Sequence, residues 1–420
     1  MQESQLRNSL DGHGERFPSL AKIEVRLEQM EAFPVDNMSG QNQCGLPVAY
    51  YRGGTSKALF FHENVLPGPG TRRDEVLKRA MGSPDPLQID GMGGAKAVTS
   101  KIAIIKRSAR DDADVDYTFV QVGTKEDTIS YEGNCGNISA AVGPFAIDEG
   151  LVSYRPGISI DTNLKCQEVR IYNTGTKKVI LSHVPIDNNG AFVHSGTETI
   201  SGVPGTGSPI LMDYRNTLGA TLSKGMFPSG NTIDMINVGG KDVQVTICDV
   251  ANWCVFAKAS DFGITGYESA SELTANEAWV DACQELRGKV GKYLGLTKDW
   301  REWDQVTAFA PLPIFVAPAK RGHIEARLFL DKMCHESMAG TGAICVTACS
   351  CIPDTIVSSV VRQAAKESTF EISHPVGIMS TLVQTDSAGV ADNLPHFQTL
   401  SFVRTARRIM DGTVYVPQNP

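Results

Sequence analysis

One short stretch of the chain decides its fold: Gly133-Asn134-Cys135-Gly136-Asn137-Ile138-Ser139-Ala140-Ala141-Val142. Its two glycines permit a tight turn, and the small residues that follow suit a helix packed closely on all sides. A thiol in the first turn of a helix sits at the positive end of the dipole, which favours the thiolate. The unpaired N–H groups of the same turn can hold a carboxylate. The motif alone leaves two interpretations open, an activated thiol beside an anion cradle or a structural turn with a buried cysteine.

A second segment, Gly340-Thr341-Gly342-Ala343-Ile344-Cys345, also leads from a glycine-rich turn into small residues. Residues 338–352 carry no charge and are fewer than the roughly 20 needed to span a bilayer, so we expect a buried helix. Cys345, Cys349 and Cys351 are predicted to lie in its core. The two segments suggest a duplicated unit whose helices point their N-termini at a shared cleft.

Elsewhere strands dominate, which predicts an α+β protein. Residues 101–106 and 117–122 are typical of two strands joined by the acidic turn 110–114, and residues 169–172 and 178–182 predict a second hairpin. The carboxylates of the acidic turn could suggest a cation site, but a solvated hairpin tip is favoured.

The clearest surface helix carries one apolar stripe. Its members recur at spacings of three and four residues and are Trp279, Cys283, Leu286, Val290 and Tyr293.

The composition excludes several classes of function. The formal charge of −8 over 420 residues argues against a nucleic-acid binder, and no apolar stretch is long enough for a membrane span. Ten cysteines without a CxxC pair favour a reducing, cytoplasmic location and predict no zinc site. Residues 1–44 are polar and mixed in charge, so we interpret them as a mobile N-terminal extension rather than a targeting peptide.

Three loops are rich in residues that bind anions. Arg52-Gly53-Gly54-Thr55-Ser56-Lys57 combines cations, hydroxyls and glycines, although it lacks the spacing of a phosphate-binding Walker loop. Residues 91–101 place a glycine-rich bend before a strand that begins with Lys101, and residues 226–231 expose a hydroxyl and an amide. Each could be an ordinary loop on its own.

Taken together, these segments resemble the PrpF-type methylaconitate isomerase family of the diaminopimelate-epimerase-like superfamily. The matching stretches, in the family's order, are residues 51–57, 82–86, 89–94, 100–101, 133–137 with 140–143, 226–231, 338–343, 374–375, 404–407 and 414–417.

The resemblance implies two similar domains, each a curved mixed sheet around a central helix, with the active site in the cleft between them. We expect the first domain over residues 45–207 and the second over residues 208–395. The C-terminal strands 396–420 are candidates to return to the first domain, and a homodimer would be ordinary for this scaffold.

The resemblance also implies a 1,3-allylic proton shift in an unsaturated tricarboxylate such as aconitate or 2-methylaconitate, without metal or organic cofactor. In the family a lysine and the cysteine of the GNCGN motif face the substrate, and these match Lys101 and Cys135. Related epimerases use two cysteines, a pattern from which this chain departs. Lys96 has no counterpart in the family pattern, and it is expected either to alter substrate choice or to face solvent. The substrate-binding residues implied are Arg52, Thr55, Ser56, Lys57, Gly93, Gly94, Ser100, Asn134, Gly136, Asn137, Ser229, Gly230, Asn231, Gly340, Thr341 and Gly342.

Such a reaction passes through a dienolate-like intermediate, so it needs a base, an acid and preorganised positive potential. Lys101 and Cys135 can supply the proton transfers, in either order. The alternatives are a keto–enol tautomerase of an oxalomesaconate-like acid and a non-catalytic anion-binding protein on the same scaffold.

Overall fold

The computed structural model describes residues 42–159, 164–219, 221–307, 310–362, 369–386 and 394–418, which form a mixed, sheet-dominated α+β fold. The predicted N-terminal extension lies almost wholly outside these residues, although the first strand begins at Gln43. The strands are β1 (Gln43–Gly53), β2 (Ser56–His62), β3 (Lys101–Arg107), β4 (Val115–Val122), β5 (Ile129–Ser130), β6 (Lys165–Asn173), β7 (Lys178–Ile186), β8 (Ile210–Asp213), β9 (Asp234–Val238), β10 (Lys241–Val250), β11 (Asn252–Lys258), β12 (Leu312–Pro318), β13 (Ile324–Leu330), β14 (Met333–Cys334), β15 (Thr369–His374), β16 (Gly377–Asp386), β17 (His396–Arg404) and β18 (Ala406–Pro417). The helices are α2 (Thr71–Met81), α3 (Gly136–Asp148), α4 (Ala270–Thr274), α5 (Glu277–Tyr293), α6 (Trp303–Val306), α7 (Gly340–Ser350) and α8 (Ile356–Val360).

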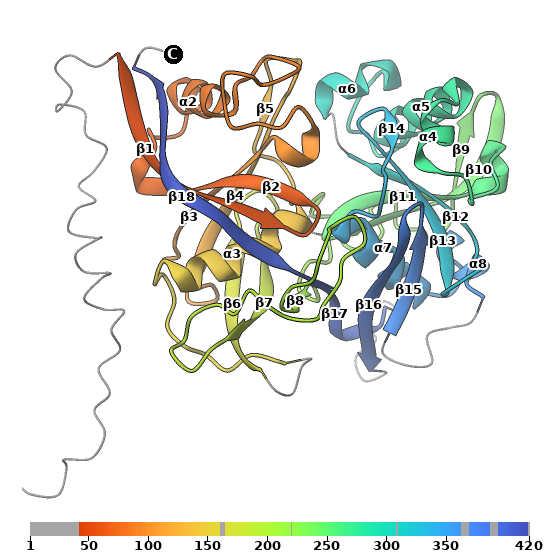
Figure 1. The fold of residues 1–420 in the computed structure, drawn as a ribbon. Helices are drawn as coiled ribbons and strands as arrows, with labels where there is room; N and C mark the ends of the chain where they lie inside the picture. Colours follow the sequence, from red (N-terminus) through yellow and green to blue (C-terminus); the bar gives the residue numbers. More distant parts are fainter. Residues whose placement is uncertain are drawn as a thin grey trace, which may run out of the picture.

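The strand pairings follow one order twice. In the first series each strand pairs with the next in the order β1, β2, β3, β4, β6, β7, β8. The pairs β2–β3 and β4–β6 are parallel, and the pairs β1–β2, β3–β4, β6–β7 and β7–β8 are antiparallel. The same series connects β10 to β11, β12, β13, β15, β16 and β17. We call β1 to β8 the first unit and β10 to β17 the second unit; they lie on the left and right of Figure 1. Antiparallel pairing of β8 with β17 joins them.

The chain returns to its start at the C-terminus. Strand β18 pairs antiparallel with β1 along its length, from Gln43 opposite Pro417 to Gly53 opposite Ala406. In Figure 1 this strand runs from the second unit across the first. Strand β9 pairs with β10 in the corresponding place in the second unit.

Each unit sandwiches its sheet between a buried helix and a surface helix. Strand β3 shows why, because its residues alternate between the two faces. Ala103 and Ile105 pack in the cluster that contains α3, whereas Ile102 and Ile104 pack in the cluster that contains α2. In the second unit α7 and α5 take the corresponding places.

The buried helices α3 and α7 begin next to each other. All residues from 136 to 146 and from 340 to 349 are buried, as expected of helices that are apolar on every side. A Cβ at Gly136 would lie 3.3 Å from the backbone nitrogen of Thr341, and one at Gly340 would lie 2.6 Å from the ring of Phe402. Both glycines therefore permit close approach. The predicted burial of Cys345 and Cys349 is confirmed, whereas Cys351 is half-buried at the end of α7.

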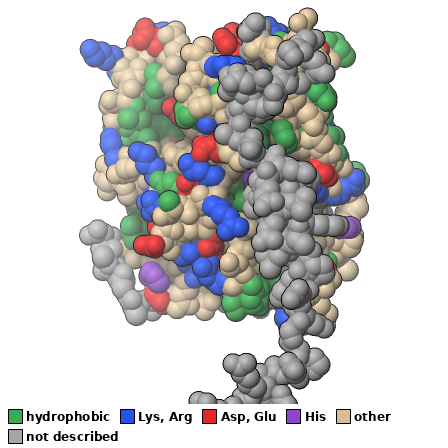
Figure 2. All heavy atoms as spheres, turned by 90° about the vertical axis from the view of Figure 1, so that its left-hand side faces the viewer, with side chains coloured by type: hydrophobic (Ala, Val, Ile, Leu, Met, Phe, Trp, Pro, Cys, Tyr) green, Lys and Arg blue, Asp and Glu red, His purple; other side chains and the backbone are tan. Residues whose placement is uncertain are grey.

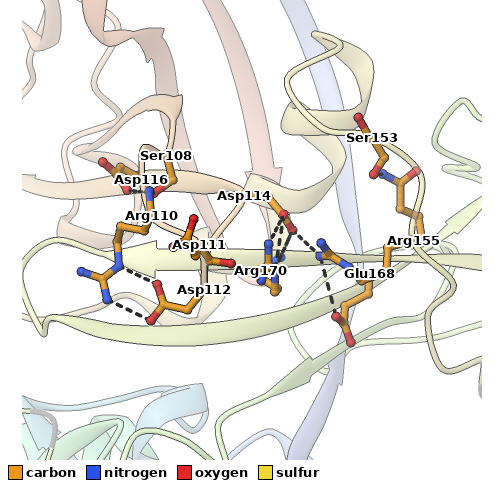
Figure 3. A network of polar contacts seen from close by, with 11 residues as sticks. Ser108, Arg110, Asp111, Asp112, Asp114, Asp116, Ser153, Arg155, Glu168 and Arg170 are labelled. Atoms are coloured by element: carbon orange, nitrogen blue, oxygen red, sulfur yellow. Dashed lines mark hydrogen bonds and ion pairs between the residues drawn. The ribbon is translucent and has the colours of Figure 1, made fainter.

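Both predicted hairpins are present, but the acidic turn is not simply a solvated tip. Asp114 accepts hydrogen bonds from the backbone and guanidinium nitrogens of Arg170, each at 2.8 Å, and from Arg155 at 2.9 Å (Figure 3). Arg110 and Asp112 form a separate exposed pair. Hence Asp114 ties the turn to β6, and within the described residues no cluster of acidic, histidine or cysteine side chains could hold a metal ion.

The predicted surface helix is α5, with one correction. Trp279, Cys283, Leu286 and Val290 are buried, but Tyr293 is 50% exposed. Tyr293 ends the helix, and its hydroxyl donates to Asp234 at 3.0 Å instead of packing in the core.

The outer face of the first unit carries charges of both signs. Figure 2 shows Lys and Arg side chains interspersed with Asp and Glu over the visible part of this face. In the described segments, no helix combines the length and apolar character required to cross a bilayer.

Candidate active site

Lys101 is the first residue of β3, and strand alternation places its side chain on the face that α3 covers. The residue is 8% exposed. Burial lowers the pKa of its ammonium group, while Cys135 and Asp331 oppose that shift. The two predicted catalytic side chains are therefore close enough for their charges to interact.

Gln121 holds the lysine in place, and the sequence analysis did not single it out. It lies opposite Lys101 in the β3–β4 ladder and is itself buried. Its amide nitrogen donates to the carbonyls of Ala97, at 3.1 Å, and Ser100, at 2.9 Å. The amide oxygen is thereby turned toward Lys101, whose Nζ donates to it. The register of the predicted hairpin was the signal that could have identified this pair.

Cys135 is the residue immediately before α3. Its backbone is extended, and its carbonyl accepts hydrogen bonds from the backbone nitrogen and the hydroxyl of Ser139, both at 2.9 Å. The thiol is half-buried. Because the first N–H groups of a helix have no partner within it, Cys135 stands beside unpaired donors. The neighbouring Asn134 is buried, and its side-chain oxygen accepts from Ser139 at 2.7 Å and from Asn173 at 3.2 Å.

Arg404 is a second residue that the predicted site lacked. It is buried at the end of β17, and its Nε donates to Asn137 Oδ1 at 3.1 Å. Asn137 in turn donates to Thr55 Oγ1 at 3.0 Å. Burial lowers the pKa of Arg404 to about 10, against the opposing charges of Tyr214, Cys135 and Glu198. Its only sequence signal was its place in residues 404–407, one of the stretches that match the family.

The second unit contributes charge around the same lysine. Asp331, between β13 and β14, acts on the pKa of Lys101. His335 follows β14, and its own pKa is lowered by burial, with Lys101 and Arg404 adding to the effect. Titratable groups from both units therefore gather about Lys101 and Cys135.

Several predicted substrate-binding residues also shape the frame of the site. Gln88 donates to the hydroxyl of buried Ser100 at 2.7 Å, and a Cβ at Gly93 would overlap the Gln88 side chain. A Cβ at Gly94 would overlap Thr99. These contacts shape the loop that leads into β3. Lys96, in the same loop, is exposed.

The loop between β1 and β2 packs on the first turn of α3. A Cβ at Gly54, whose φ is +48°, would lie 2.2 Å from Asn137 Oδ1, so this close approach requires glycine. Arg52 donates to the carbonyls of Gly54, at 3.0 Å, and Thr405, at 2.8 Å. Ser56 is buried, and Lys57 Nζ lies 5.4 Å from the ring centroid of Tyr50. Thr55 adds a hydrogen bond to the contact between this loop and α3, because its hydroxyl accepts from Asn137.

The turn at residues 229–231 forms hydrogen bonds within itself and with Asp234. The amide of Asn231 donates to Asp234 at 2.9 Å, and its backbone nitrogen donates to Ser229 at 3.2 Å. Gly230 is exposed. By contrast, Gly340, Thr341 and Gly342 lie at the start of α7, against the start of α3.

The two units differ at the residue before the buried helix, where a mechanism with two thiols would require a cysteine in each unit. Helix α3 follows Cys135, and α7 follows Ala339. The second unit thus has an alanine in the place of a second cysteine. Cys345 cannot replace it, because this thiol is fully buried inside α7 and contacts the carbonyls of Cys248 and Asn252, each at 3.5 Å.

Solved structures define the class to which this fold belongs. The crystal structure of a hydroxyproline epimerase from Agrobacterium vitis has a TM-score of 0.51 at 10% identity, covering 91% of this chain and 95% of that one. This likeness shows a shared fold. A crystal structure of methylitaconate-delta-isomerase is much nearer, with a TM-score of 0.74 at 36% identity and coverage of 90% and 97%.

Sequence comparison specifies the family within that class. The model of the PrpF protein family matches residues 43–417. The 3-methylitaconate isomerase of Eubacterium barkeri is 37% identical, covering 89% of this chain and 98% of the relative. The (4E)-oxalomesaconate Delta-isomerase of Novosphingobium sp. is 36% identical, covering 90% and 99%, and the 2-methyl-aconitate isomerase of Shewanella oneidensis is 33% identical, covering 90% and 98%. The chain belongs to the PrpF family, and it is an isomerase.

Proposed function

We propose that this isomerase catalyses a 1,3-allylic proton shift in an unsaturated tricarboxylate such as aconitate or 2-methylaconitate. The reaction would take place where the first and second units meet, in a cleft between two similar domains. One observation carries the proposal: the buried amine of Lys101 and the thiol of Cys135 lie within reach of each other's charge, beside the paired starts of α3 and α7.

The lysine and the cysteine together can balance the protons of this reaction. One group removes a proton from the carbon next to a carboxylate, and the C–H electron pair becomes part of a dienolate. The other group gives a proton to the carbon two positions away, and the double bond settles between the remaining two carbons. Transfer of one proton between the two groups, directly or through water, restores the starting state. Because burial lowers the pKa of Lys101, a larger fraction of this lysine is in the neutral amine form than for a surface lysine at the same pH.

The surroundings supply positive potential for the dienolate. The first N–H groups of α3 and α7 point toward the region where both helices begin, and Arg404 is held there by Asn137. Preorganised donors in a site from which water is excluded stabilise developing negative charge. The relatives whose names include methylitaconate, oxalomesaconate and 2-methyl-aconitate are consistent with a polycarboxylate substrate.

Solvent exchange tests the proposal. The purified protein is incubated in deuterium oxide with cis-aconitate, trans-aconitate, 2-methylaconitate, itaconate or oxalomesaconate, and NMR follows deuterium entry and double-bond position. Lys101→Met and Cys135→Ser should each reduce exchange on the accepted substrate by about 10²–10⁴-fold, the usual contribution of a positioned acid or base.

Two matched variants control for loss of charge and loss of a thiol away from the site. Lys298→Met removes an exposed lysine after α5, and Cys351→Ser removes a half-buried thiol at the far end of α7. Both should exchange at the parental rate, and circular dichroism melts should show all four variants folded. Folded Lys101→Met and Cys135→Ser proteins that exchange as fast as the parent would refute the mechanism. Exchange on oxalomesaconate without migration of a carbon–carbon double bond would instead identify a keto–enol tautomerase.

A further inference from the structure

A cavity of about 130 Å³ lies beside Arg404. Its walls include the connection between β7 and β8, the residues before α7, and strands β15, β16 and β17. At about 30 Å³ for each water, the cavity has room for about four waters or a group as large as a carboxymethyl. The polar and charged side chains among its lining residues are Thr55, Glu198, Thr199, Ser201, Ser337, His374, Ser380 and Arg404.

Arg404 lines this cavity, and its guanidinium has more N–H donors than strong acceptors among the described residues. A guanidinium has five N–H donors. Those of Arg404 bond to Asn137 Oδ1, to the carbonyl of Val403 at 2.9 Å and to the weakly accepting sulfur of Met379 at 3.0 Å. Among the described residues, no carboxylate forms an ion pair with it. A buried arginine in this condition is unusual, because buried charges are ordinarily paired.

His374 adds an unsatisfied polar atom to the same wall. The residue is 6% exposed, and its Nδ1 has no hydrogen-bond partner in the described part of the chain. Burial, together with the charges of Arg404, His335 and Arg327, lowers the pKa of His374 to about 4, so the ring is neutral near pH 7. A neutral imidazole can donate one N–H to a carboxylate.

Glu198 also lines the cavity, from the connection between β7 and β8. Its backbone pairs with Gly207 through two hydrogen bonds of 2.9 Å, and a Cβ at Gly207 would lie 2.9 Å from Thr405. This pairing keeps Glu198 beside β17. Burial raises the pKa of Glu198, and Arg404 opposes the shift without forming an ion pair.

We infer that this cavity binds a carboxylate of the substrate remote from the carbons between which the proton moves, with Arg404 and His374 as its donors. The inference rests on the proposed function and specifies how a tricarboxylate is distinguished from a dicarboxylate. Arg404 also contacts Asn137 in the first turn of α3, so one residue joins this subsite to the lysine and cysteine. Water filling a structural gap is the alternative occupant.

The subsite makes ligand binding depend on pH through Glu198. A carboxylate placed beside Arg404 and Glu198 favours the protonated form of the glutamate, so binding takes up a proton. The affinity for the carboxylate should therefore fall as pH rises through the titration of Glu198 in the free protein. Glu198→Gln should remove the pH dependence of affinity that is due to this glutamate. The titratable groups around Glu198 and its neighbour Arg404 are His374, His335, Tyr214 and Cys135.

Binding of unreactive ligands tests the subsite apart from catalysis. Isothermal titration calorimetry compares tricarballylate, a saturated tricarboxylate, with glutarate, a dicarboxylate of similar length, on the full-length protein. Arg404→Gln should weaken tricarballylate binding by about 30-fold or more, as expected for loss of a buried charged hydrogen-bonding partner, and should weaken glutarate binding much less. Arg407→Gln is the matched control, because this exposed arginine on β18 carries the same charge three residues away.

A second variant leaves the buried arginine in place. Ile378→Trp enlarges a half-buried side chain on the cavity wall, and it should also weaken tricarballylate selectively. Tricarballylate that binds a folded Arg404→Gln or Ile378→Trp protein as tightly as the parent would overturn the inference. So would equal weakening of both ligands, or failure of the parent to bind tricarballylate. In each of these cases deuterium exchange lost in Lys101→Met and Cys135→Ser would leave the proposed reaction standing.

Discussion

Replacement of Gln121 by leucine should shift the pH dependence of the reaction without removing either proton-transfer group. The ammonium of Lys101 donates to the amide oxygen of Gln121. A hydrogen bond made by a charged group contributes about 1.5–3 kcal/mol, against about 0.5–1.5 kcal/mol for a neutral one. Loss of the Gln121 amide oxygen therefore destabilises the ammonium form of Lys101 by about 1–1.5 kcal/mol relative to the neutral amine. Since 1.36 kcal/mol corresponds to one pKa unit, the effect equals about one pH unit.

The sign of the shift is the same whichever role the lysine has. If Lys101 is the base, its neutral form is active, and the acid limb of the kcat/KM profile moves to lower pH. If Lys101 is the acid, its ammonium is active, and the alkaline limb moves to lower pH. Gln121→Glu supplies the opposite perturbation, because an ionised carboxylate favours the ammonium and moves the same limb to higher pH.

The assay is the rate of deuterium exchange from about pH 5 to 10 on the substrate that the panel identifies. Leucine also leaves the carbonyls of Ala97 and Ser100 without their amide donor, which costs about 1–3 kcal/mol of stability, so thermal melts must show that the variant is folded at each pH. Identical limbs in the parent, the leucine and the glutamate variants would refute the assignment of Lys101 as a titrating catalytic group held by Gln121.

Three further predictions concern stability. Gly340→Ala should destabilise the fold by about 1–3 kcal/mol in urea denaturation, because its Cβ would lie 2.6 Å from the ring of Phe402; an unchanged midpoint would contradict the close contact between α7 and β17. Leu286→Ala should lower the free energy of unfolding by about 2–5 kcal/mol, and Tyr293→Ala by less than about 1 kcal/mol, because only the leucine is buried. Equal losses of stability would instead support the five-residue apolar stripe predicted for α5. Asp114→Asn should cost about 1–2 kcal/mol at pH 7 after allowance for solvent screening. Although partial burial raises the pKa of Asp114, its hydrogen bonds to Arg170 and Arg155 produce a net lowering. Its contribution to stability is therefore present above the unfolded pKa and is lost as pH falls through the folded pKa. A gap between parent and variant that does not narrow as pH falls below the unfolded pKa would contradict this origin.

Local patterns sufficed for the parts of the fold that local physics determines. The composition of residues 101–106 indicated a strand, and the alternation of side chains along a strand explains why Lys101 faces α3 while Ile102 faces α2. Small residues after residue 133 indicated a helix buried on all sides, which α3 is. The five-residue stripe failed only at Tyr293, where the helix ends and a hydroxyl can reach Asp234.

The missing site residues required information that no window of sequence contains. Arg404 bonds to a residue 267 positions away, and its place beside α3 depends on β17 pairing with β8. Gln121 is nearer, but its position opposite Lys101 depends on the register of the β3–β4 ladder, which the length of the turn sets. Asp331 and His335 reach the site because the second unit faces the first. The catalytic roles of Lys101 and Cys135 remain predictions.

The repeat explains why a fold shared with an epimerase should here favour a different reaction. In the parallel pairing of β2 with β3, Ala58 lies opposite Lys101; in the corresponding pairing of β11 with β12, Cys254 lies opposite Leu312. Leucine thus replaces the lysine in the second unit, just as Ala339 replaces Cys135. Inversion at one carbon requires proton-transfer groups on its two faces, which a symmetric pair of thiols can provide. Here both candidate groups come from the first unit, while the second unit contributes a helix start and charged side chains. That asymmetry suits transfer of a proton between two carbons of a bound anion better than inversion at one.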